Sequence, residues 1–525
     1  MKKIFETLIM VMMFSAAASL FAAGQGQSGA ANSNAPVTLE LWYGATSSEA
    51  GPPPVDWKAV QIVRDTQNIN WVLSMLPSST GDRDTKINAA AANTLPDLFS
   101  VSRETLQNLV KTGLVAATDD LYASMPTWYK QYGGNDGKEY VTINGKAYGI
   151  AYMGGGQPRN EGIIIRKDWL DKLGLKAPVT TQDYLDVMKA FTFNDPDGNG
   201  RNDTYGFGAF LEINANEEGL GRRFDSFFGA FGVLGTWNLS RANPGLNIRK
   251  SAYFDALSYV KTLVDEKVID PNWLSYGRDD FRAAWKQGRF GIMRENHSAY
   301  ASESNYAPFD KNFPNGSWIV IDPPKGPRGE LAVGSYTNSF GIIAVSAKAI
   351  KEGKGPAIAR LFEWMATDDA YYLLGWGEKG VNYNLDPNGV PVVDGLPDPE
   401  KAYTKPAMIP LTQLRGYIQR NSDNELVSRY PTYKAPTSGK TMSALTVLRD
   451  MQNRPWLNVL GVDTLPVPNS DLKRFYEQRV IEFVTGQRQL TRANWEACVA
   501  EFDNLGGLDW EKAGIASAEA NGYLK

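Results

Sequence analysis

The chain has 525 residues, a formal net charge of −4, a single histidine and a single cysteine. A mildly acidic chain without a basic stripe is a poor candidate for binding nucleic acid. With a single histidine, Ser–His–Asp or Cys–His hydrolysis would depend entirely on that residue, and a histidine-rich zinc site is not possible. A single cysteine excludes an internal disulfide.

The N-terminus has the three-part layout of a secretory signal peptide: a basic pair at residues 2–3, an apolar run at residues 8–21, and small residues after it. The run is shorter than the roughly 20 apolar residues that a transmembrane helix needs. We expect cleavage after Gly24, with Ala18 as the alternative site and a buried N-terminal helix as the competing interpretation. Because no cysteine stands at this point to carry a lipid, we expect a soluble, unanchored protein in the periplasm.

The remaining chain of about 500 residues exceeds the 250–300 at which a single hydrophobic core stops growing, so we expect two lobes. Residues 25–36 are mostly small and polar, which is typical of a flexible leader. Strands are then predicted at residues 37–43, 69–75 and 96–101, and helices at residues 82–92 and 103–112. This alternation predicts an α/β fold, with a parallel sheet covered by helices.

Three glycines at residues 154–156 separate this region from the next and are interpreted as a hinge. A phosphate-binding loop is the alternative interpretation, but no Lys-Ser or Lys-Thr pair follows the glycines. Further helices are predicted at residues 167–173, 253–264 and 357–374, and after Thr180, where Asp183 completes a capping box.

The loop at residues 195–203 reads DPDGNGRND and has the spacing of a calcium-binding loop. Oxygen side chains stand at positions one, three, five and nine, a glycine at position six allows the sharp bend, and the Arg201 carbonyl would serve position seven. Position twelve, where a bidentate glutamate is usual, is Gly206, so Thr204, water or a distant residue such as Glu212 would have to complete the site. We predict a structural Ca²⁺; a solvated turn is the alternative. The predicted metal ligands are Asp195, Asp197, Asn199, Arg201 and Asp203.

A set of segments is informative when taken together: residues 95–98, 145–149, 165–175, 178–180, 184–191, 281–293, 362–370 and 380–383. In this order they resemble the family 1 extracellular solute-binding proteins of ABC importers, and are most similar to the branch of the LipO-type and alginate-binding proteins. The resemblance runs from about residue 37 to the C-terminus. It implies a type II periplasmic-binding-protein fold, the two-lobed α/β Venus flytrap, with crossing segments at its hinge.

With this fold we expect residues 37–152 and 330–375 to form the first lobe, and residues 153–329 and 376–525 the second. The family implies a non-catalytic, monomeric substrate-binding component that captures a carbohydrate by lobe closure and delivers it to the permease subunits of an ABC importer. An oligosaccharide is the expected ligand. In alginate-binding relatives the calcium loop lies away from the sugar, which agrees with a structural role here.

A sugar-binding cleft needs aromatic rings for the C–H faces of the sugar and polar side chains for its hydroxyls. Residues that follow strands, or that lie at hinges, are placed where such clefts form. On this basis the predicted ligand-binding residues are Trp42, Tyr43, Arg103, Tyr152, Arg159, Asn160, Glu161, Trp237, Arg294, Glu295, Tyr336, Asn338 and Trp376. Core packing is the alternative for each aromatic residue, and a surface ion pair is the alternative for each arginine.

Two other functions stay open at this point. A secreted glycoside hydrolase or polysaccharide lyase would share the aromatic residues, the calcium and the export, and a hydrolase would need two carboxylates about 5–10 Å apart across a cleft. A peptide-binding receptor of the same fold would differ only in its ligand.

Overall fold

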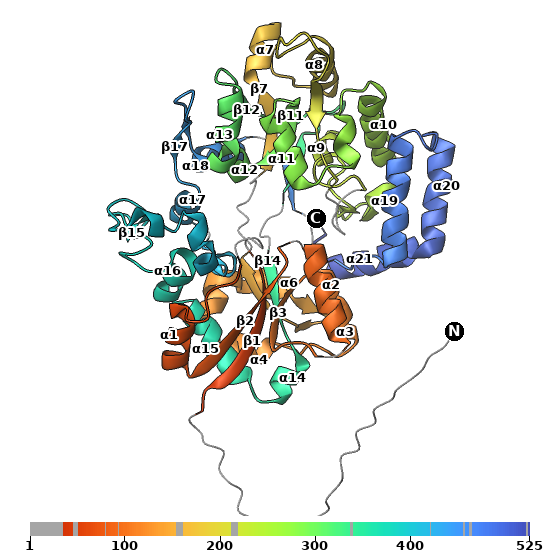
Figure 1. The fold of residues 1–525 in the computed structure, drawn as a ribbon. Coiled ribbons are helices and arrows are strands. Elements are labelled where there is room, and N and C mark those ends of the chain that lie inside the picture. The colour runs from red at the N-terminus through yellow and green to blue at the C-terminus, as the bar shows by residue number, and fades with distance from the viewer. Residues whose placement is uncertain are drawn as a thin grey trace, which may run out of the picture.

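The computed structural model describes residues 35–45, 51–78, 80–92, 94–153, 161–211, 219–335, 340–420, 422–454, 457–460, 465–520 and 523–524. Within these ranges the chain folds into two lobes, each built on its own sheet (Figure 1). The expected signal peptide, most of the leader and the three glycines of the expected hinge lie outside the described residues.

The first lobe is built on a five-stranded sheet of order β2-β1-β3-β14-β6. Its strands are β1 Val37–Gly44, β2 Ile69–Leu76, β3 Leu98–Val101, β14 Phe340–Val345 and β6 Ile150–Met153. β1 pairs in parallel with β2 and β3, as the alternating pattern predicts. β14 runs antiparallel to both β3 and β6, so the sheet is mixed rather than purely parallel.

The helices of this first segment lie close to their predicted bounds. α2 is Thr80–Ala91, and α3 is Arg103–Lys111 with Ser102 as its N-cap, whose side chain accepts from the Thr105 amide. Because β1, β2 and β3 are parallel, the starts of α2 and α3 lie at the carboxyl edge of the sheet. In Figure 1 this edge faces the other lobe.

The second lobe is built on a four-stranded sheet of order β12-β7-β11-β8. Its strands are β12 Trp318–Ile321, β7 Glu161–Arg166, β11 Phe290–Asn296 and β8 Tyr205–Gly208. Helices α7 Lys167–Leu173, α8 Thr181–Phe193, α10 Ser251–Asp265 and α11 Arg278–Lys286 belong to it. The predicted capping box is confirmed: the Thr180 side chain accepts from the Asp183 amide, and the Asp183 carboxylate accepts from the Thr180 amide.

The long helix predicted at residues 357–374 is two helices, α15 Gly355–Met365 and α16 Asp368–Trp376. Thr367 begins the second one because its side chain accepts from the Ala370 amide. Two aspartates then occupy the first turn of α16, where the positive end of the helix dipole favours them. The apolar periodicity continues across the break, which is why the pattern alone predicted a single helix.

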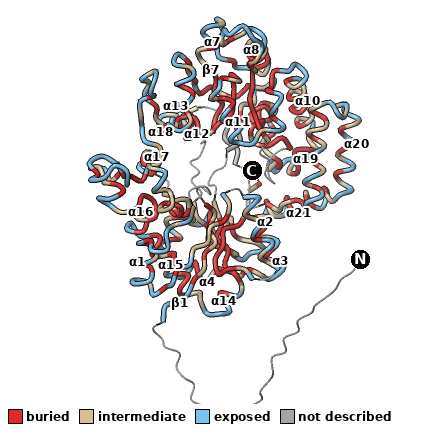
Figure 2. Tube along the Cα trace, in the orientation of Figure 1, coloured by how far each residue is buried: buried red, intermediate tan, exposed pale blue. Residues whose placement is uncertain are grey.

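Separate hydrophobic clusters fill the two lobes, as the buried segments in Figure 2 show. The first cluster runs from Leu39 to Ala151 and from Ile342 to Ile418. It therefore includes Tyr383, Tyr403 and Tyr417, which differs from the expected boundary at residue 376. The clusters of the second lobe contain residues from Ile163 to Val333 and again from Ala435 onward.

Three C-terminal helices, α19 Ser470–Val484, α20 Arg492–Phe502 and α21 Leu508–Ala520, pack on the second lobe and reach toward the first (Figure 1). Lys473 in α19 forms an ion pair of 3.6 Å with Glu104 in α3. These helices therefore bound one side of the space between the lobes.

Candidate functional site

A cavity of about 1140 Å³ lies between the lobes and is lined from both sides. The first lobe contributes side chains of α3 and of the turn between strands β4 Thr142–Ile143 and β5 Lys146–Ala147. The second lobe contributes residues 466–470 and one face of α21. Most of the lining side chains are polar, and among them are Arg103, Glu104, Gln107, Asn144, Asn469 and Asp509. A cavity shared between two lobes is a common place for a small-molecule site.

Arg103, a predicted ligand-binding residue, lines this cavity. It directly follows β3, and Ser102 caps the helix that it begins. Its guanidinium donates to the backbone carbonyls of Tyr140, at 2.9 Å, and Thr142, at 3.3 Å. These bonds hold the side chain against the wall of the first lobe, so Arg103 forms a fixed part of the cavity.

The carboxyl edge of the first sheet also carries a pair of stacked tyrosines, Tyr152 in β6 and Tyr417 in the short helix η6 Arg415–Tyr417. Their ring centroids are 4.5 Å apart. The Tyr417 hydroxyl accepts from the Gly44 amide at 2.6 Å, which ties the pair to the end of β1. Burial raises the pKa of both phenols, so both stay protonated and can donate hydrogen bonds.

A glycine in the neighbouring strand makes this arrangement possible. A Cβ on Gly341 of β14 would lie 2.0 Å from Cζ of Tyr152, so only a glycine lets the ring cross the strand. Tyr152 was predicted from its place beside the hinge. Tyr417 was not, because no local pattern marks a residue in a short 3₁₀ helix, and only the tertiary fold brings it to β1.

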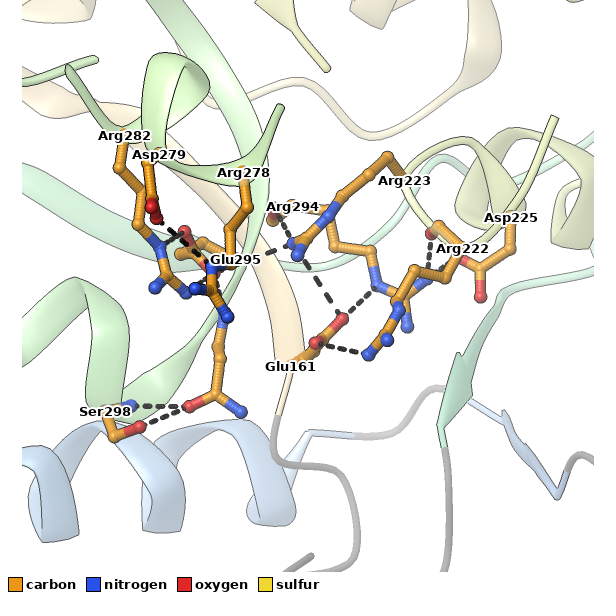
Figure 3. Close-up of polar contacts among 11 residues, drawn as sticks. Glu161, Arg222, Arg223, Asp225, Arg278, Asp279, Arg282, Arg294, Glu295 and Ser298 are labelled. Atoms are coloured by element: carbon orange, nitrogen blue, oxygen red, sulfur yellow. Dashed lines mark hydrogen bonds and ion pairs between the residues drawn. The ribbon is translucent and has the colours of Figure 1, made fainter. Parts of the chain in front are cut away.

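The second lobe contains a cluster of arginines and carboxylates where β7 begins and β11 ends, which we call the arginine–carboxylate cluster (Figure 3). It consists of Glu161, Arg222, Arg223, Asp225, Arg282, Arg294 and Glu295. Glu161 opens β7 directly across from Asn296 of the antiparallel strand β11, and Arg294 and Glu295 come just before Asn296. The other members come from the segment before helix α9 Asp225–Gly229, from its first residue and from α11.

The distances within the cluster are short, and most of its atoms are buried. Arg222 lies 3.2 Å and Arg294 lies 3.3 Å from the Glu161 carboxylate. Arg282 pairs with Glu295 at 3.0 Å, and Arg294 pairs with Asp225 at 2.5 Å. Glu295 has no exposed side-chain surface. Buried charges of this kind require such partners, because removing one of them leaves the other uncompensated.

The charge state of Glu161 follows from these contacts. Burial by itself would raise the pKa of the carboxyl, but the positive charges of Arg223, Arg294 and Arg222 outweigh it and lower the pKa to about 2. A carboxylate held ionised in this way cannot act as a general acid near neutral pH. Glu161 is therefore not a proton donor in this cluster, whose arginines present guanidinium N–H groups.

The structure brings three predicted residues, Glu161, Arg294 and Glu295, into this one cluster. Sequence reasoning missed Arg222, Arg223, Asp225 and Arg282. A doubled arginine at residues 222–223 was the only local signal for the first two. Nothing in the sequence indicated that these residues meet β7 and β11.

Other predicted aromatic residues lie inside the lobes, which differs from the expected position at the cleft. Tyr43 and Trp376 have no exposed surface, because the alternation of β1 turns Tyr43 inward and Arg415 covers Trp376 at 4.5 Å. Trp237 packs edge-on against Trp510, with ring centroids 5.2 Å apart, one layer behind the cavity wall. These rings fill cores, since each is a large hydrophobic side chain before it is a sugar platform.

Trp42 is partly buried on the opposite face of β1, and its indole N–H donates to Glu40 at 2.7 Å. Four predicted residues, Arg159, Asn160, Tyr336 and Asn338, lie outside the described residues.

The Asp-rich loop at residues 195–203 folds back on its own first residue. The Asp195 carboxylate accepts from the amides of Gly198, Asn199 and Gly200 at 2.9–3.0 Å. Gly198 and Gly200 have positive φ angles of 77° and 75°, which allow the tight turns. The Asn199 side chain donates to Asp197 at 2.8 Å and to Asp203 at 3.0 Å, so these carboxylates converge on one point.

The donor set of this loop consists of oxygens, which suits a hard cation such as Ca²⁺. Burial, a hydrogen bond with Asp195 and the nearby Asp203 charge raise the pKa of Asp197, and a cation at this point would relieve that crowding. Thr204 and Gly206 are turned away, because the Thr204 hydroxyl donates to the Phe191 carbonyl at 2.8 Å and Gly206 packs on Met188. Within the described part of the chain, no three His, Cys, Asp or Glu side chains are already gathered as a metal site.

We compared the sequence with models of known protein families. The family model that describes bacterial extracellular solute-binding proteins matches residues 65–376 of this chain. This chain belongs to that family. The resemblance predicted from the sequence is thereby confirmed. Among the helices of the described ranges of this solute-binding protein, none is long and apolar enough to cross a membrane.

Individual relatives agree with this assignment. The chain is 28% identical over 344 residues to the polygalacturonan/rhamnogalacturonan-binding protein YtcQ of Bacillus subtilis, an alignment that covers 63% of this chain and 64% of YtcQ, just under two thirds of that relative. The structure of an EF-hand mutant of the S. pneumoniae ABC-transporter substrate-binding protein FusA with fructo-nystose superposes with a TM-score of 0.66 at 19% identity, covering 93% of this chain and 100% of FusA.

A structure of the alginate-binding protein AlgQ2 without calcium ion gives a TM-score of 0.67 at 15% identity, covering 93% of this chain and 99% of AlgQ2. At these identities the superpositions show the fold, and the predicted two-lobed periplasmic-binding-protein fold is confirmed.

Proposed function

We propose that this protein is the extracytoplasmic substrate-binding component of an ABC importer and that it captures an oligosaccharide between its two lobes. The observation that carries the proposal is the cavity shared by α3 of the first lobe and α21 of the second. A ligand that touches both walls favours the closed arrangement of the lobes, so capture and closure are coupled. The ligand class is supported by the polygalacturonan/rhamnogalacturonan-binding protein YtcQ and by the FusA complex with fructo-nystose.

We propose as ligand-contacting groups Arg103, which lines the cavity, the tyrosines Tyr152 and Tyr417, and the arginine–carboxylate cluster of the second lobe. The tyrosines supply aromatic surface and hydroxyl donors, and the charged groups supply donors and acceptors for sugar hydroxyls. Trp42, at the end of β1, and the predicted residues outside the described ranges stay part of the proposal.

We propose that the protein is a receptor rather than an enzyme. Its most deeply buried carboxylates at the cleft, Glu161 and Glu295, are each paired with arginines and so do not form the acid–base pair that a glycosidase needs. A turnover assay on oligosaccharides tests this. Release of new reducing ends by the purified protein would contradict the receptor proposal.

We also propose that residues 195–203 bind Ca²⁺ in a structural role. Asp195, Asp197, Asn199 and Asp203 would donate side-chain oxygens, and Arg201 would donate its carbonyl. Support comes from the converging carboxylates and from the similar structures of an EF-hand mutant of FusA and of AlgQ2 without calcium ion. The loop follows α8, at the far end of the second lobe in Figure 1, so the ion would stabilise this end of the lobe.

The remaining elements of the proposal concern location and partners. We propose an exported, unanchored monomer that delivers its ligand to two permease subunits in the membrane. The expected signal peptide and the family description, which is extracellular, support export.

Isothermal titration calorimetry with a panel of neutral and acidic oligosaccharides and of short peptides tests the central proposal. We expect a saccharide to bind and small-angle scattering to report a more compact protein when it does. Tyr152→Phe should lower the affinity, whereas Tyr372→Phe, which removes a hydroxyl bonded to the Gly389 carbonyl elsewhere in the same lobe, should not. Binding of peptides alone, or binding without compaction, would contradict the proposal.

A further inference from the structure

Arg83 stands in the first turn of α2, at the carboxyl edge of the first-lobe sheet, and no sequence pattern marked it. Its guanidinium lies against the last residue of β1, because a Cβ built on Gly44 would be 2.6 Å from Nη1 and 3.5 Å from Cζ of Arg83. The amide of the same glycine donates to Tyr417. Arg83 is therefore beside the stacked tyrosines, at the carboxyl edge of the first-lobe sheet, which faces the second lobe (Figure 1).

Electrostatics agree with this position. Burial dominates and raises the pKa of Tyr152 and of Tyr417, and the positive charge of Arg83 opposes that rise at both hydroxyls. A single guanidinium thus faces two phenol groups that come from distant parts of the chain. The three side chains form one polar surface at the end of β1.

Among the described residues, no carboxylate is paired with the Arg83 guanidinium. Nη2 donates to the Thr80 hydroxyl at 3.1 Å, and Nε is buried without a hydrogen-bond partner. The neighbouring Asp84 is already bonded to the Ser102 amide, at 3.1 Å, and to the Thr105 hydroxyl, at 3.0 Å.

The arginines of the second-lobe cluster differ from Arg83 in that they have carboxylate partners. In the arginine–carboxylate cluster the guanidinium groups are paired with Glu161, Glu295 and Asp225. These arginines form ion pairs within the second lobe, whereas Arg83 has no such partner among the described residues and is available to pair with a ligand. A guanidinium binds a carboxylate through two parallel N–H···O bonds, which neutral hydroxyls cannot match in strength.

We infer that the ligand is an acidic oligosaccharide, with a uronate carboxylate that binds Arg83 beside Tyr152 and Tyr417. This inference rests on the proposed function and deepens it, since it names the class of saccharide. Arg83 is then the residue that distinguishes an acidic sugar from a neutral one.

The test is titration calorimetry of the full-length mature protein with trimers of galacturonate, of glucuronate and of mannuronate, each compared with its own methyl ester. Esterification removes the charge and keeps the sugar. We expect at least one acid to bind about ten- to a hundredfold more tightly than its ester, the range for a hydrogen-bonded charged group. The advantage should fall as salt is raised, because the ion pair is screened.

Two variants assign the effect to Arg83. Arg83→Gln should bring the affinity ratio of acid to ester close to one, and Arg83→Lys should retain part of it because the charge stays and the planar fork is lost. Arg64→Gln is the matched control: Arg64 is exposed in the last turn of helix α1 Lys58–Gln67, at the opposite edge of the sheet, and its variant should keep the full ratio. Should Arg83→Gln not fold, the acid-to-ester affinity ratios of the wild type and of Arg83→Lys still test whether Arg83 binds the carboxylate.

The outcomes separate the two levels of the proposal. If neutral saccharides bind and every ester binds as tightly as its acid, or if Arg83→Gln keeps the full ratio, the inference about Arg83 is wrong and the receptor function stands. If no saccharide, acidic or neutral, binds the wild-type protein, the proposed function itself is overturned.

Discussion

The arginine–carboxylate cluster can be perturbed at one atom by Glu161→Gln. The substitution keeps the shape of the side chain and removes the negative charge that Arg222, Arg223 and Arg294 share. The lowering of the Glu161 pKa from 4.5 to about 2 corresponds to roughly 3 kcal/mol of stability, at 1.36 kcal/mol per pKa unit. Removing one partner of a buried ion pair typically lowers the free energy of unfolding by about 3–5 kcal/mol, which agrees with this value.

The sign of the pH dependence follows from the direction of the shift. A carboxyl whose pKa is lower in the folded state contributes its full stability above the unfolded value of 4.5, and that contribution is lost as the pH falls toward 2. The variant cannot titrate at this position. We therefore expect the difference in free energy of unfolding between wild type and Glu161→Gln to be largest above pH 5 and to shrink below pH 4.5.

Urea unfolding followed by tryptophan fluorescence at pH 7, 5 and 3 measures this difference. Glu496→Gln is the control, because Glu496 is exposed on α20 and its loss should cost within about 0.5 kcal/mol. A difference for Glu161→Gln below about 1 kcal/mol at pH 7 would refute the reasoning. So would a difference that stays constant down to pH 3, since the cost would then come from packing rather than from charge.

Three further predictions concern other parts of the molecule. Excess Ca²⁺ should raise the melting temperature of the wild type by binding the native state, and Asp195→Ala should abolish the rise while Asp186→Ala, on the exposed face of α8, keeps it in calorimetric scans. Gly341→Ala should displace the ring of Tyr152, which would lie 2.0 Å from the new methyl, and so lower ligand affinity in titrations and cost about 1–3 kcal/mol in urea unfolding. Trp237→Ala should cost about 3–5 kcal/mol, because the ring is 6% exposed and packs on its neighbours; a loss of ligand affinity without a loss of stability would contradict its role in the core.

Local chemistry made part of this structure predictable. The alternation over residues 37–43 and 69–75 predicted β1 and β2, and the Thr180–Asp183 capping box predicted the start of α8. The spacing of residues 195–203 predicted a loop in which Asp197 and Asp203 converge. Each of these patterns is complete within about a dozen residues, so no distant contact is needed to read it.

The predicted boundary at residue 376 shows where local patterns end. Which lobe a segment joins depends on which hydrophobic core its side chains fill. The local sequence around Tyr403 and Tyr417 does not indicate which core that is, and the structure places both in the core of the first lobe. The single helix predicted at residues 357–374 failed for a related reason. Apolar periodicity continued across a break that one side-chain cap at Thr367 decided.

The sequence by itself determined the class of the protein: two α/β lobes, the order of the main strands and helices, and the family whose motifs follow one another along the chain. Only the tertiary structure decided which side chains meet at the cleft. Glu161 and Arg222 are 61 positions apart, and Gly44 and Tyr417 are 373 apart. Contacts across such separations depend on how strands and lobes pack. A side chain such as Arg83 becomes a candidate for ligand binding only when the fold leaves its charge, within the described residues, without a carboxylate partner at the carboxyl edge of the first-lobe sheet.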